Sequence, residues 1–481
     1  MKELANIALN ITQMEGASYT DIRIILARSE SIALKNGVIG HINKGESLGF
    51  GVRVIINGGW GFSSSSRLNK EGIEEATRLA CRTARTTSSL KLRDIHLTPE
   101  PIYNEIWQTP YAIDPFKVSL EEKLTFLAQI DKILRADTRI KVAISSMDFF
   151  NEHQWLATSE GTFIDQSLMR SAAGFSAMAV DKGEMQIRSY PSSHGGLSMS
   201  MGYELVRESD FLENAERIRD EAIALLTAPK CPQGEKDIIL DGAQLALQIH
   251  ESCGHPTELD RVLGSEADYA GTSFLLLDQL HKLQYGSEIV DLIIDGTVPG
   301  GLATVGFDDD GVRAGRYYIV KEGRFVGYQT NRELGRITGE NFSRGCNRAD
   351  GFSAPPMIRQ SNLSLMPGEW TLEELIEDTQ DGIYMINNKS WSIDQRRLNF
   401  QFGCEIAWEI KKGKIGRIFK DPTYQGMTIQ FWNSCDAICN QDNWRLWGVL
   451  NCGKGQPNQR AEMSHGAASA RFRKVRVGIG S

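Results

Sequence analysis

Hydrophobic residues recur along this chain with two different periods, which predict helices and strands in separate segments. A helical period predicts four helices, each with one apolar face, at residues 4–14, 70–86, 120–135 and 212–228. A two-residue alternation predicts long strands at residues 21–35, 49–66, 141–167 and 171–180. Asn36 and Gly37 follow the first of these strands and predict a turn there.

Beyond residue 234 the pattern changes to many short strands with few helices between them. Two segments in this region are typical of hairpins, because strand-forming residues flank a glycine-containing turn: YYIVKEGRFVGY at 317–328 and EIAWEIKKGKIGRIF at 405–419. The C-terminal region is therefore expected to be strand-rich, and it is the largest part of the chain.

The length of the chain predicts more than one domain, since 481 residues exceed what a single hydrophobic core usually supports. Proline and glycine cluster at two candidate boundaries, between Pro99 and Pro115 and between Pro229 and Gly234. We predict an N-terminal α+β domain, a middle α+β domain and a strand-rich C-terminal domain, at 1–98, 99–230 and 231–481. The predicted fold class is α+β, in which N-terminal and middle α/β units precede a large, barrel-like C-terminal domain.

The charge balance narrows the classes of partner. Lys and Arg number 53 against 61 Asp and Glu, which gives a formal net charge of −8. A general nucleic-acid binder needs a basic surface, so we expect no nucleic-acid partner. The one concentrated basic stretch, RFRKVRV at 471–477, alternates basic and apolar residues and predicts an edge strand with a charged outer face.

Neither a membrane span nor a secretory signal is evident in the sequence. No run approaches the roughly 18 apolar residues that a spanning helix needs, and MKELANIALNITQMEG lacks an unbroken apolar core. The eight cysteines are spread without a dense framework, which is typical of reduced thiols. We therefore expect a cytoplasmic protein that does not associate with membranes.

The segment LALQIHESCGHPTE carries two of the eight histidines and predicts a candidate metal site on a helix. Asp241 is available as the N-cap of this helix, which is expected to end at Gly254. His250 and His255 are five positions apart, so in a regular α-helix they would lie about 140° out of line. A π-type turn, or unwinding at Gly254 and Pro256, would bring both imidazoles to one ion.

Spacing alone leaves the ligand set open. Cys253 is three positions from His250 and is an alternative to His255. A further ligand would come from Cys452 in the glycine-rich segment VLNCGKGQPNQ, which predicts a loop. Cys435 and Cys439 are alternatives, although their spacing in SCDAIC is also typical of buried cysteines on an apolar helix.

Glu251 follows the first histidine directly and has the chemistry of a general base for water. In the competing interpretation, both histidines merely cap or pack the helix end and Glu251 is a solvated surface acid. Candidates for an oxyanion donor are His465, Tyr269 and Arg348, each of which also fits an ordinary loop or surface role. The acidic run FDDDG, Asp308 to Asp310, lacks the pattern of a calcium loop and predicts a solvated turn.

Several motifs in order make the chain resemble the TldD/PmbA family of metalloproteases, and most closely its TldD-like, active-site-bearing branch. The resemblance covers nearly the whole length, through ASYTDIRI, SLGFGVRVIINGGWGFSSSS, HESCGHPTELD, GTSFLL, IDGTVPGGLATVGFDDDGVRAGRYYIVKEGRFVGYQTNRE, DGIYM and NCGKGQ. It implies that His250, His255 and Cys452 are the ligands of one Zn²⁺ per chain and that Glu251 is the catalytic base. His255 is thereby favoured over Cys253.

The resemblance also implies a function and a partner. The expected activity is that of a zinc-dependent metallopeptidase that hydrolyses small, unfolded or modified peptides, held by strand addition. Family members are similar in forming dimers, so a homodimer, or a heterodimer with a metal-free paralogue, is expected. The alternative function is a non-catalytic peptide-binding or regulatory subunit with a structural metal. The segment PNQRAEMSHGAAS departs from the family pattern, which puts the shape of the substrate pocket in question.

Overall fold

The computed structural model describes residues 1–91 and 93–478, and its N-terminal half is built on one long sheet. The sheet has the order β3-β2-β1-β5-β6-β4, and β7 and β8 also pair with β6. Its eight strands are β1 (Tyr19–Lys35), β2 (Val38–Ile56), β3 (Gly59–Ser65), β4 (Asn104–Gln108), β5 (Ile140–Thr158), β6 (Phe163–Asp181), β7 (Glu184–Tyr190) and β8 (Leu197–Met199). Long strands form where the sequence predicted them, although β2 begins at Val38 and a turn separates β5 from β6 within the predicted strand 141–167; β1 ends at the predicted turn.

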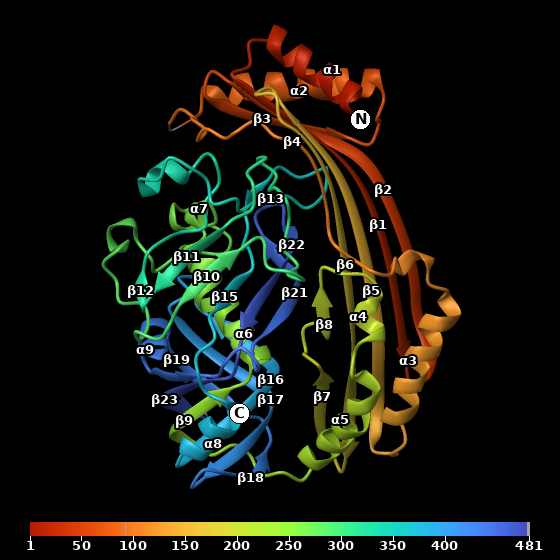
Figure 1. The fold of residues 1–481 in the computed structure, drawn as a ribbon, viewed down its shortest axis with the longest axis vertical. Helices are drawn as coiled ribbons and strands as arrows, with labels where there is room; N and C mark the ends of the chain where they lie inside the picture. Colours follow the sequence, from red (N-terminus) through yellow and green to blue (C-terminus); the bar gives the residue numbers. More distant parts are fainter. Residues whose placement is uncertain (92, 479–481) are drawn as a thin grey trace.

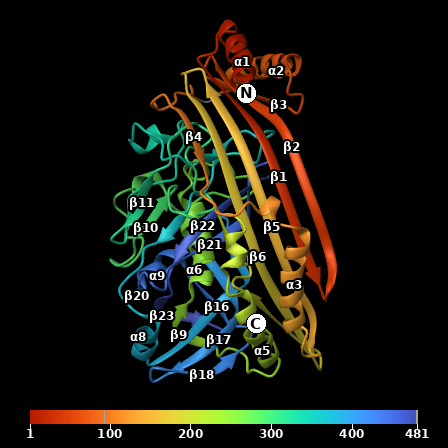
Figure 2. The ribbon, with the colours of Figure 1, turned by 45° about the vertical axis from the view of Figure 1, so that its right-hand side comes forward.

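The first two sequence units share this sheet. Strand β1 pairs along its length with β2 on one side and with β5 on the other, so that Ile24 lies opposite both Phe50 and Trp155. The four longest strands run lengthwise beside the C-terminal domain (Figures 1 and 2). The units are therefore continuous through β1 and β5, and each of the two hydrophobic cores on this sheet contains residues from both units.

Four amphipathic helices cover the two ends of the sheet, as their apolar periodicity predicts. Helices α1 (Lys2–Met14) and α2 (Lys70–Ser88) pack together at one end, and α3 (Leu120–Leu134) and α5 (Phe211–Leu225) pack together at the other (Figure 1). The short α4 (Glu204–Arg207) precedes α5. Helix α2 begins where the Asn69 side chain accepts a hydrogen bond from the Gly72 N–H, at 2.8 Å.

The C-terminal domain contains a closed barrel, which confirms the predicted fold class. Strands β16, β9, β23, β19 and β17 pair in that order, and β16 pairs back with β17; β18 and β20 extend the sheet. The strands are β9 (Gly234–Leu240), β16 (Asp381–Ile393), β17 (Asn399–Lys411), β18 (Lys414–Phe419), β19 (Thr423–Met427), β20 (Cys435–Ile438) and β23 (Ala470–Val477). The predicted hairpin at 405–419 is β17–β18.

Smaller elements pack beside this barrel. A four-stranded sheet contains the other predicted hairpin, β11–β12, and two further pairs are β13–β14 and β21–β22. These strands are β10 (Leu292–Asp295), β11 (Arg316–Lys321), β12 (Arg324–Phe325), β13 (Asn347–Arg348), β14 (Met357–Ile358), β15 (Leu363–Leu365), β21 (Arg445–Lys454) and β22 (Gln459–Ala467). The helices are α6 (Gly242–Ile249), α7 (Leu259–Val262), α8 (Leu372–Asp378) and α9 (Thr428–Asn433). The largest hydrophobic core joins α6 to the barrel.

The basic stretch at 471–477 is not an edge strand, so that prediction was wrong. It forms most of β23, which lies between β9 and β19 and also pairs with β20. Arg471 is 2% exposed, and its guanidinium is paired with Asp436 and Asp378. The acidic partners come from other segments, and the local alternation therefore could not reveal that the arginine is buried.

The acidic run at 308–310 is not a solvated turn, because all three carboxylates are buried between the C-terminal domain and the long sheet. Asp310 Oδ1 lies 2.7 Å from Arg53 Nη2, and Arg53 also pairs with Asp21. Asp309 accepts a hydrogen bond from Gln154 at 2.9 Å. The run therefore fixes the C-terminal domain to β1, β2 and β5.

Candidate metal centre

Helix α6 presents the segment that carries both histidines. The Asp241 side chain accepts a hydrogen bond from the Gln244 N–H at 2.9 Å, which confirms the predicted N-cap. Leu245 and Ile249 anchor the helix in the core of the C-terminal domain. The N-cap and the buried face of the helix therefore determine the position of the next turn, which bears His250.

A π-helical turn spans residues His250–Gly254 and is followed by a 3₁₀ turn at His255–Thr257. This geometry brings the ring centroids of His250 and His255 to 4.8 Å, as the five-residue spacing requires. The carbonyl oxygens of the turn accept hydrogen bonds from Gln360 and Gln329, at 3.1 and 3.0 Å. Side chains from outside the turn therefore satisfy carbonyl oxygens that the irregular helix leaves without a regular partner.

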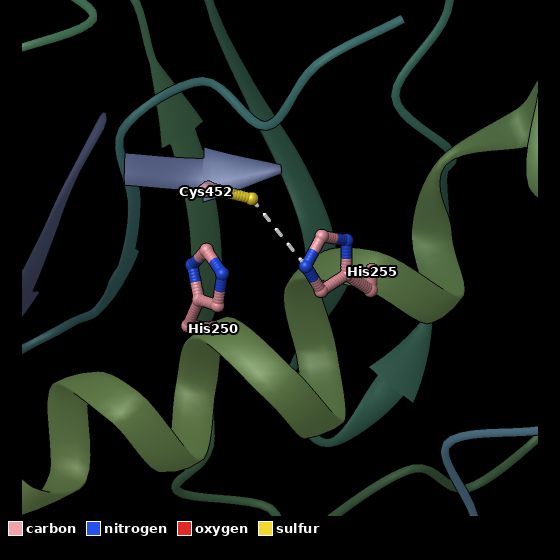
Figure 3. Close-up of side chains that lie close together, drawn as sticks. All are labelled: His250, His255 and Cys452. Atoms are coloured by element: carbon pink, nitrogen blue, oxygen red, sulfur yellow. Dashed lines mark hydrogen bonds between the residues drawn. The ribbon is translucent and has the colours of Figure 1, made fainter. Parts of the chain in front are cut away.

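Cys452 approaches the two histidines from strand β21, not from a loop as the glycine-rich sequence predicted. The pairing of β21 with β22 shifts register between Val449 and Cys452, and this irregularity lies just before the cysteine. Cys452 Sγ lies 3.5 Å from His255 Nε2 (Figure 3). One possible ligand atom from each of the three side chains lies within 4.8 Å of the other two. All three side chains are buried.

The other candidate cysteines lie outside this cluster. Cys253 packs in the core, and burial raises the pKa of its thiol to about 12. Cys435 begins strand β20, so the predicted helix at SCDAIC was wrong, and burial raises the pKa of Cys439 to about 12. Neutral, buried thiols are poor metal ligands, because the thiolate is the ligand form.

Hydrogen bonds fix which nitrogen of His250 is free. His465 Nδ1 donates to the Leu363 carbonyl oxygen at 2.8 Å, because a carbonyl can only accept. His465 Nε2 must then accept from His250 Nδ1, also at 2.8 Å. Burial lowers the pKa of both imidazoles, which favours these neutral forms. The lone pair of His250 is therefore on Nε2, which is available to a metal.

A carboxylate determines which nitrogen of His255 is free. His255 Nδ1 donates to Glu258 Oε2 at 2.9 Å, and Nε2 faces Cys452. Glu258 is fully buried; burial alone would raise its pKa, but the Lys454 ammonium, 3.3 Å from Oε1, lowers it well below its usual value. An ionised carboxylate behind a ligating imidazole is a common arrangement in metal sites.

The charge state of Cys452 also fits a ligand. Burial opposes ionisation of its thiol, but His255 and Arg359 outweigh burial and lower the pKa of Cys452 below its usual value. The Arg359 guanidinium donates to the Cys452 carbonyl oxygen, so a positive charge is held beside this residue. The site therefore favours a thiolate at the position that faces both histidines.

Glu251 is buried and forms an ion pair with Arg397, so it is not a solvated surface acid. Arg397 lies in the turn between β16 and β17 and has a left-handed backbone with φ of 64°. Burial raises the pKa of Glu251, but neighbouring charges, with the Arg397 guanidinium first among them, outweigh burial and lower it. The carboxylate next to the first candidate ligand is therefore ionised and held in a fixed direction.

The three candidate oxyanion donors differ in position. His465 is fully buried against His250, so the prediction that it has an ordinary loop or surface role was wrong. Tyr269 is 51% exposed, as an ordinary surface residue would be. Arg348 donates to the carbonyl oxygens of Glu462 and Gln360, both at 2.7 Å, which is a structural role.

Several residues around this site were missed in the sequence: Glu258, Arg359, Arg397, Lys454 and His194. Glu258 had a weak local signal, because it lies three positions after His255. Arg397 and His194 had none, since they reach the site from the β16–β17 turn and from the β7–β8 connection.

Family models match three parts of the chain. They describe domain 1 of the PmbA/TldA metallopeptidases at residues 20–84, the central domain at 113–226 and the C-terminal domain at 233–479. A metalloprotease of Methanocaldococcus jannaschii is 30% identical over 427 residues, which are 88% of this chain and 90% of that protein. A protein named zinc metalloprotease TldD homolog, from Saccharolobus solfataricus, is 21% identical over 96% of this chain and 97% of that protein.

Solved structures share the fold. The TldE structure from Thermococcus kodakarensis aligns with a TM-score of 0.71 at 15% identity, over 98% of this chain and 100% of that one. The chain belongs to the PmbA/TldA metallopeptidase family. Within the described ranges, no helix is both long and apolar enough to span a membrane.

Proposed function

We propose that this protein is a zinc-dependent peptidase that hydrolyses small, unfolded or modified peptides. The donor set supports zinc, because two neutral imidazole nitrogens and a thiolate are preferred zinc ligands. His250 Nε2, His255 Nε2 and Cys452 Sγ would hold one ion per chain, and the hydrogen bonds to His465 and Glu258 orient the two imidazoles toward it.

The number of ligands supports a catalytic site over a structural one. The described residues offer three grouped ligands, whereas a structural zinc is usually enclosed by four. A zinc ion held by these three residues would supply a Lewis acid that makes water acidic at neutral pH. This count weighs against the alternative, a non-catalytic peptide-binding or regulatory subunit with a structural metal.

Glu251 is the proposed general base. Its carboxylate is ionised and accepts a proton from the attacking water, which it then returns to the leaving amine of the cleaved peptide. Arg397 orients the carboxylate through the ion pair. The observation that carries the proposal is this pairing of a buried, ionised Glu251 with the adjacent three-ligand cluster.

We further propose that the protein is cytoplasmic and works as a homodimer or as a heterodimer with a metal-free paralogue. Strand β2 supports association, because β3 covers only Phe50–Ile56 of its outer edge, and residues 38–49 have no outer partner strand among the described residues. Val38 and Ile39 are 68% and 50% exposed there. An open strand edge with exposed apolar side chains favours pairing with another chain.

The test compares Glu251→Gln with the wild type for zinc content and for cleavage of an unstructured peptide. Glu369→Gln is the matched control, because Glu369 is exposed and lies outside the site. We expect all three proteins to bind about one zinc and only Glu251→Gln to lose cleavage. A wild type that binds zinc and cleaves nothing, even with a metal-free paralogue added, would favour the regulatory subunit.

A further inference from the structure

His194 lies in a loop that packs against β21, the strand that bears Cys452: a Cβ on the next residue, Gly195, would lie 3.2 Å from the Leu450 side chain. His194 lies in the connection between β7 and β8, in the N-terminal half of the chain. Its Nε2 is buried and has no hydrogen-bond partner among the described residues. A buried polar atom without a partner costs free energy, so it indicates a position where a ligand completes the bond.

The surrounding contacts fix the direction of this ring. The Ser192 hydroxyl donates to the Gly196 carbonyl oxygen at 2.9 Å and accepts from the backbone N–H of His194 at 3.3 Å. These two hydrogen bonds hold the backbone of residues 192–196 in a tight turn. A Cβ on Gly196 would lie 2.1 Å from the Ala173 carbonyl oxygen, so the loop packs directly against β6. The ring of His194 packs edge-on against Trp391, with centroids 5.6 Å apart.

His194 is close enough to the metal cluster to interact electrostatically with its residues. His250 and Glu251 both act electrostatically on its ring, and burial, the largest influence, lowers the pKa of His194 to about 4. The imidazole is therefore neutral at neutral pH and carries one N–H. Trp391, which packs against this ring, is 50% exposed, so an aromatic side chain beside His194 is open to contact from outside.

We propose that His194 Nε2–H donates a hydrogen bond to the carbonyl oxygen of the scissile peptide bond. The inference rests on the proposed peptidase function and adds to it a specific donor, from a different sequence unit than Glu251. When water adds to the carbonyl carbon, that oxygen gains negative charge and the hydrogen bond strengthens. The proton stays on His194, and Glu251 carries the proton of the water. Two other candidates for this role, His465 and Arg348, are held by hydrogen bonds to His250 and to backbone carbonyl oxygens.

The test uses three substitutions in the zinc-loaded full-length protein: His194→Ala, His194→Phe and His194→Gln. Phenylalanine keeps an aromatic ring against Trp391 but has no donor, whereas glutamine has an N–H that can replace the donor. Exposed His96, changed to Phe, is the control. Zinc content, melting temperature, kcat and KM on an unstructured peptide, and affinity for a phosphinate peptide that mimics the tetrahedral state are measured for each.

We expect Ala and Phe to lower kcat by about 10²–10³-fold with little change in KM, zinc content or melting temperature. The affinity for the phosphinate should fall with kcat/KM, and Gln should restore part of both. Wild-type kcat in His194→Phe would overturn the inference, because packing alone would then suffice. Loss of zinc or of folding in all three variants would also overturn it. A wild type that binds zinc but cleaves no peptide would instead refute the proposed peptidase function, and the inference with it.

Discussion

His465 Nε2 lies 2.8 Å from His250 Nδ1 and thereby determines which nitrogen of His250 is free. His465→Ala removes this acceptor, and we expect zinc affinity to fall by about 10–100-fold, as for other residues that orient a metal ligand. His465→Gln should keep much of the affinity, because its amide can accept from His250 and donate to Leu363. Competition with a chelator measures both variants; equal affinity of Ala and wild type would refute this role.

Glu258 is expected to act in the same way on His255. Glu258→Ala should lower zinc affinity by about 10–100-fold, since His255 Nδ1 loses its acceptor. Asp260→Asn is a matched control, because Asp260 contacts the same Lys454, at 2.7 Å, but not His255. If both variants lost zinc equally, the effect would come from Lys454 and the local packing, not from orientation of the imidazole.

Gly254 is expected to tolerate no side chain at the end of the π-helical turn. A Cβ there would lie 1.9 Å from Gln360 Oε1, and Gln360 also donates to the His250 carbonyl oxygen. Gly254→Ala should therefore lower the free energy of unfolding by about 1–3 kcal/mol and weaken zinc binding. Gly40→Ala, where the nearest atom is 3.4 Å from the added Cβ, should change neither. Denaturant unfolding and zinc titration measure the two effects.

The buried acidic run predicts a stabilising contact between the C-terminal domain and the sheet. Asp310→Asn should lower the free energy of unfolding by about 1.5–3 kcal/mol, because Arg53 loses one of its two charged partners in a buried site. Glu46→Gln removes a carboxylate from the exposed pair with Arg28 and should cost less than about 1 kcal/mol. Equal costs in denaturant unfolding would show that the buried contact adds no stability.

Local sequence patterns predicted the long helices, several long strands and the two hairpins, and the irregular turn at His250. Periodicity depends on which face of an element is buried, so it correctly indicated the four helices over the sheet and the hairpin at 405–419. The five-residue spacing of His250 and His255 required a local change of helix geometry, and the π-helical turn is that change. The N-cap at Asp241 followed from local chemistry in the same way.

Features that depend on distant partners could not be predicted. Asp309 and Asp310 are buried because Arg23, Arg53 and Gln154 bind them, and those residues lie at least 155 positions away. Arg471 is buried for a similar reason, and Cys452 looked like a loop residue because glycines surround it. Arg397 and His194 reach the centre only through the tertiary fold.

The most direct test of the central claim is the zinc K-edge X-ray absorption spectrum of the full-length protein loaded with one zinc. The account predicts two nitrogen ligands at about 2.0 Å, one sulfur at about 2.3 Å and one further light ligand that peptide phosphinate displaces. Cys452→Ser should remove the sulfur contribution. Two sulfur ligands, or a fourth ligand that the phosphinate cannot displace, would contradict an open catalytic site built from His250, His255 and Cys452.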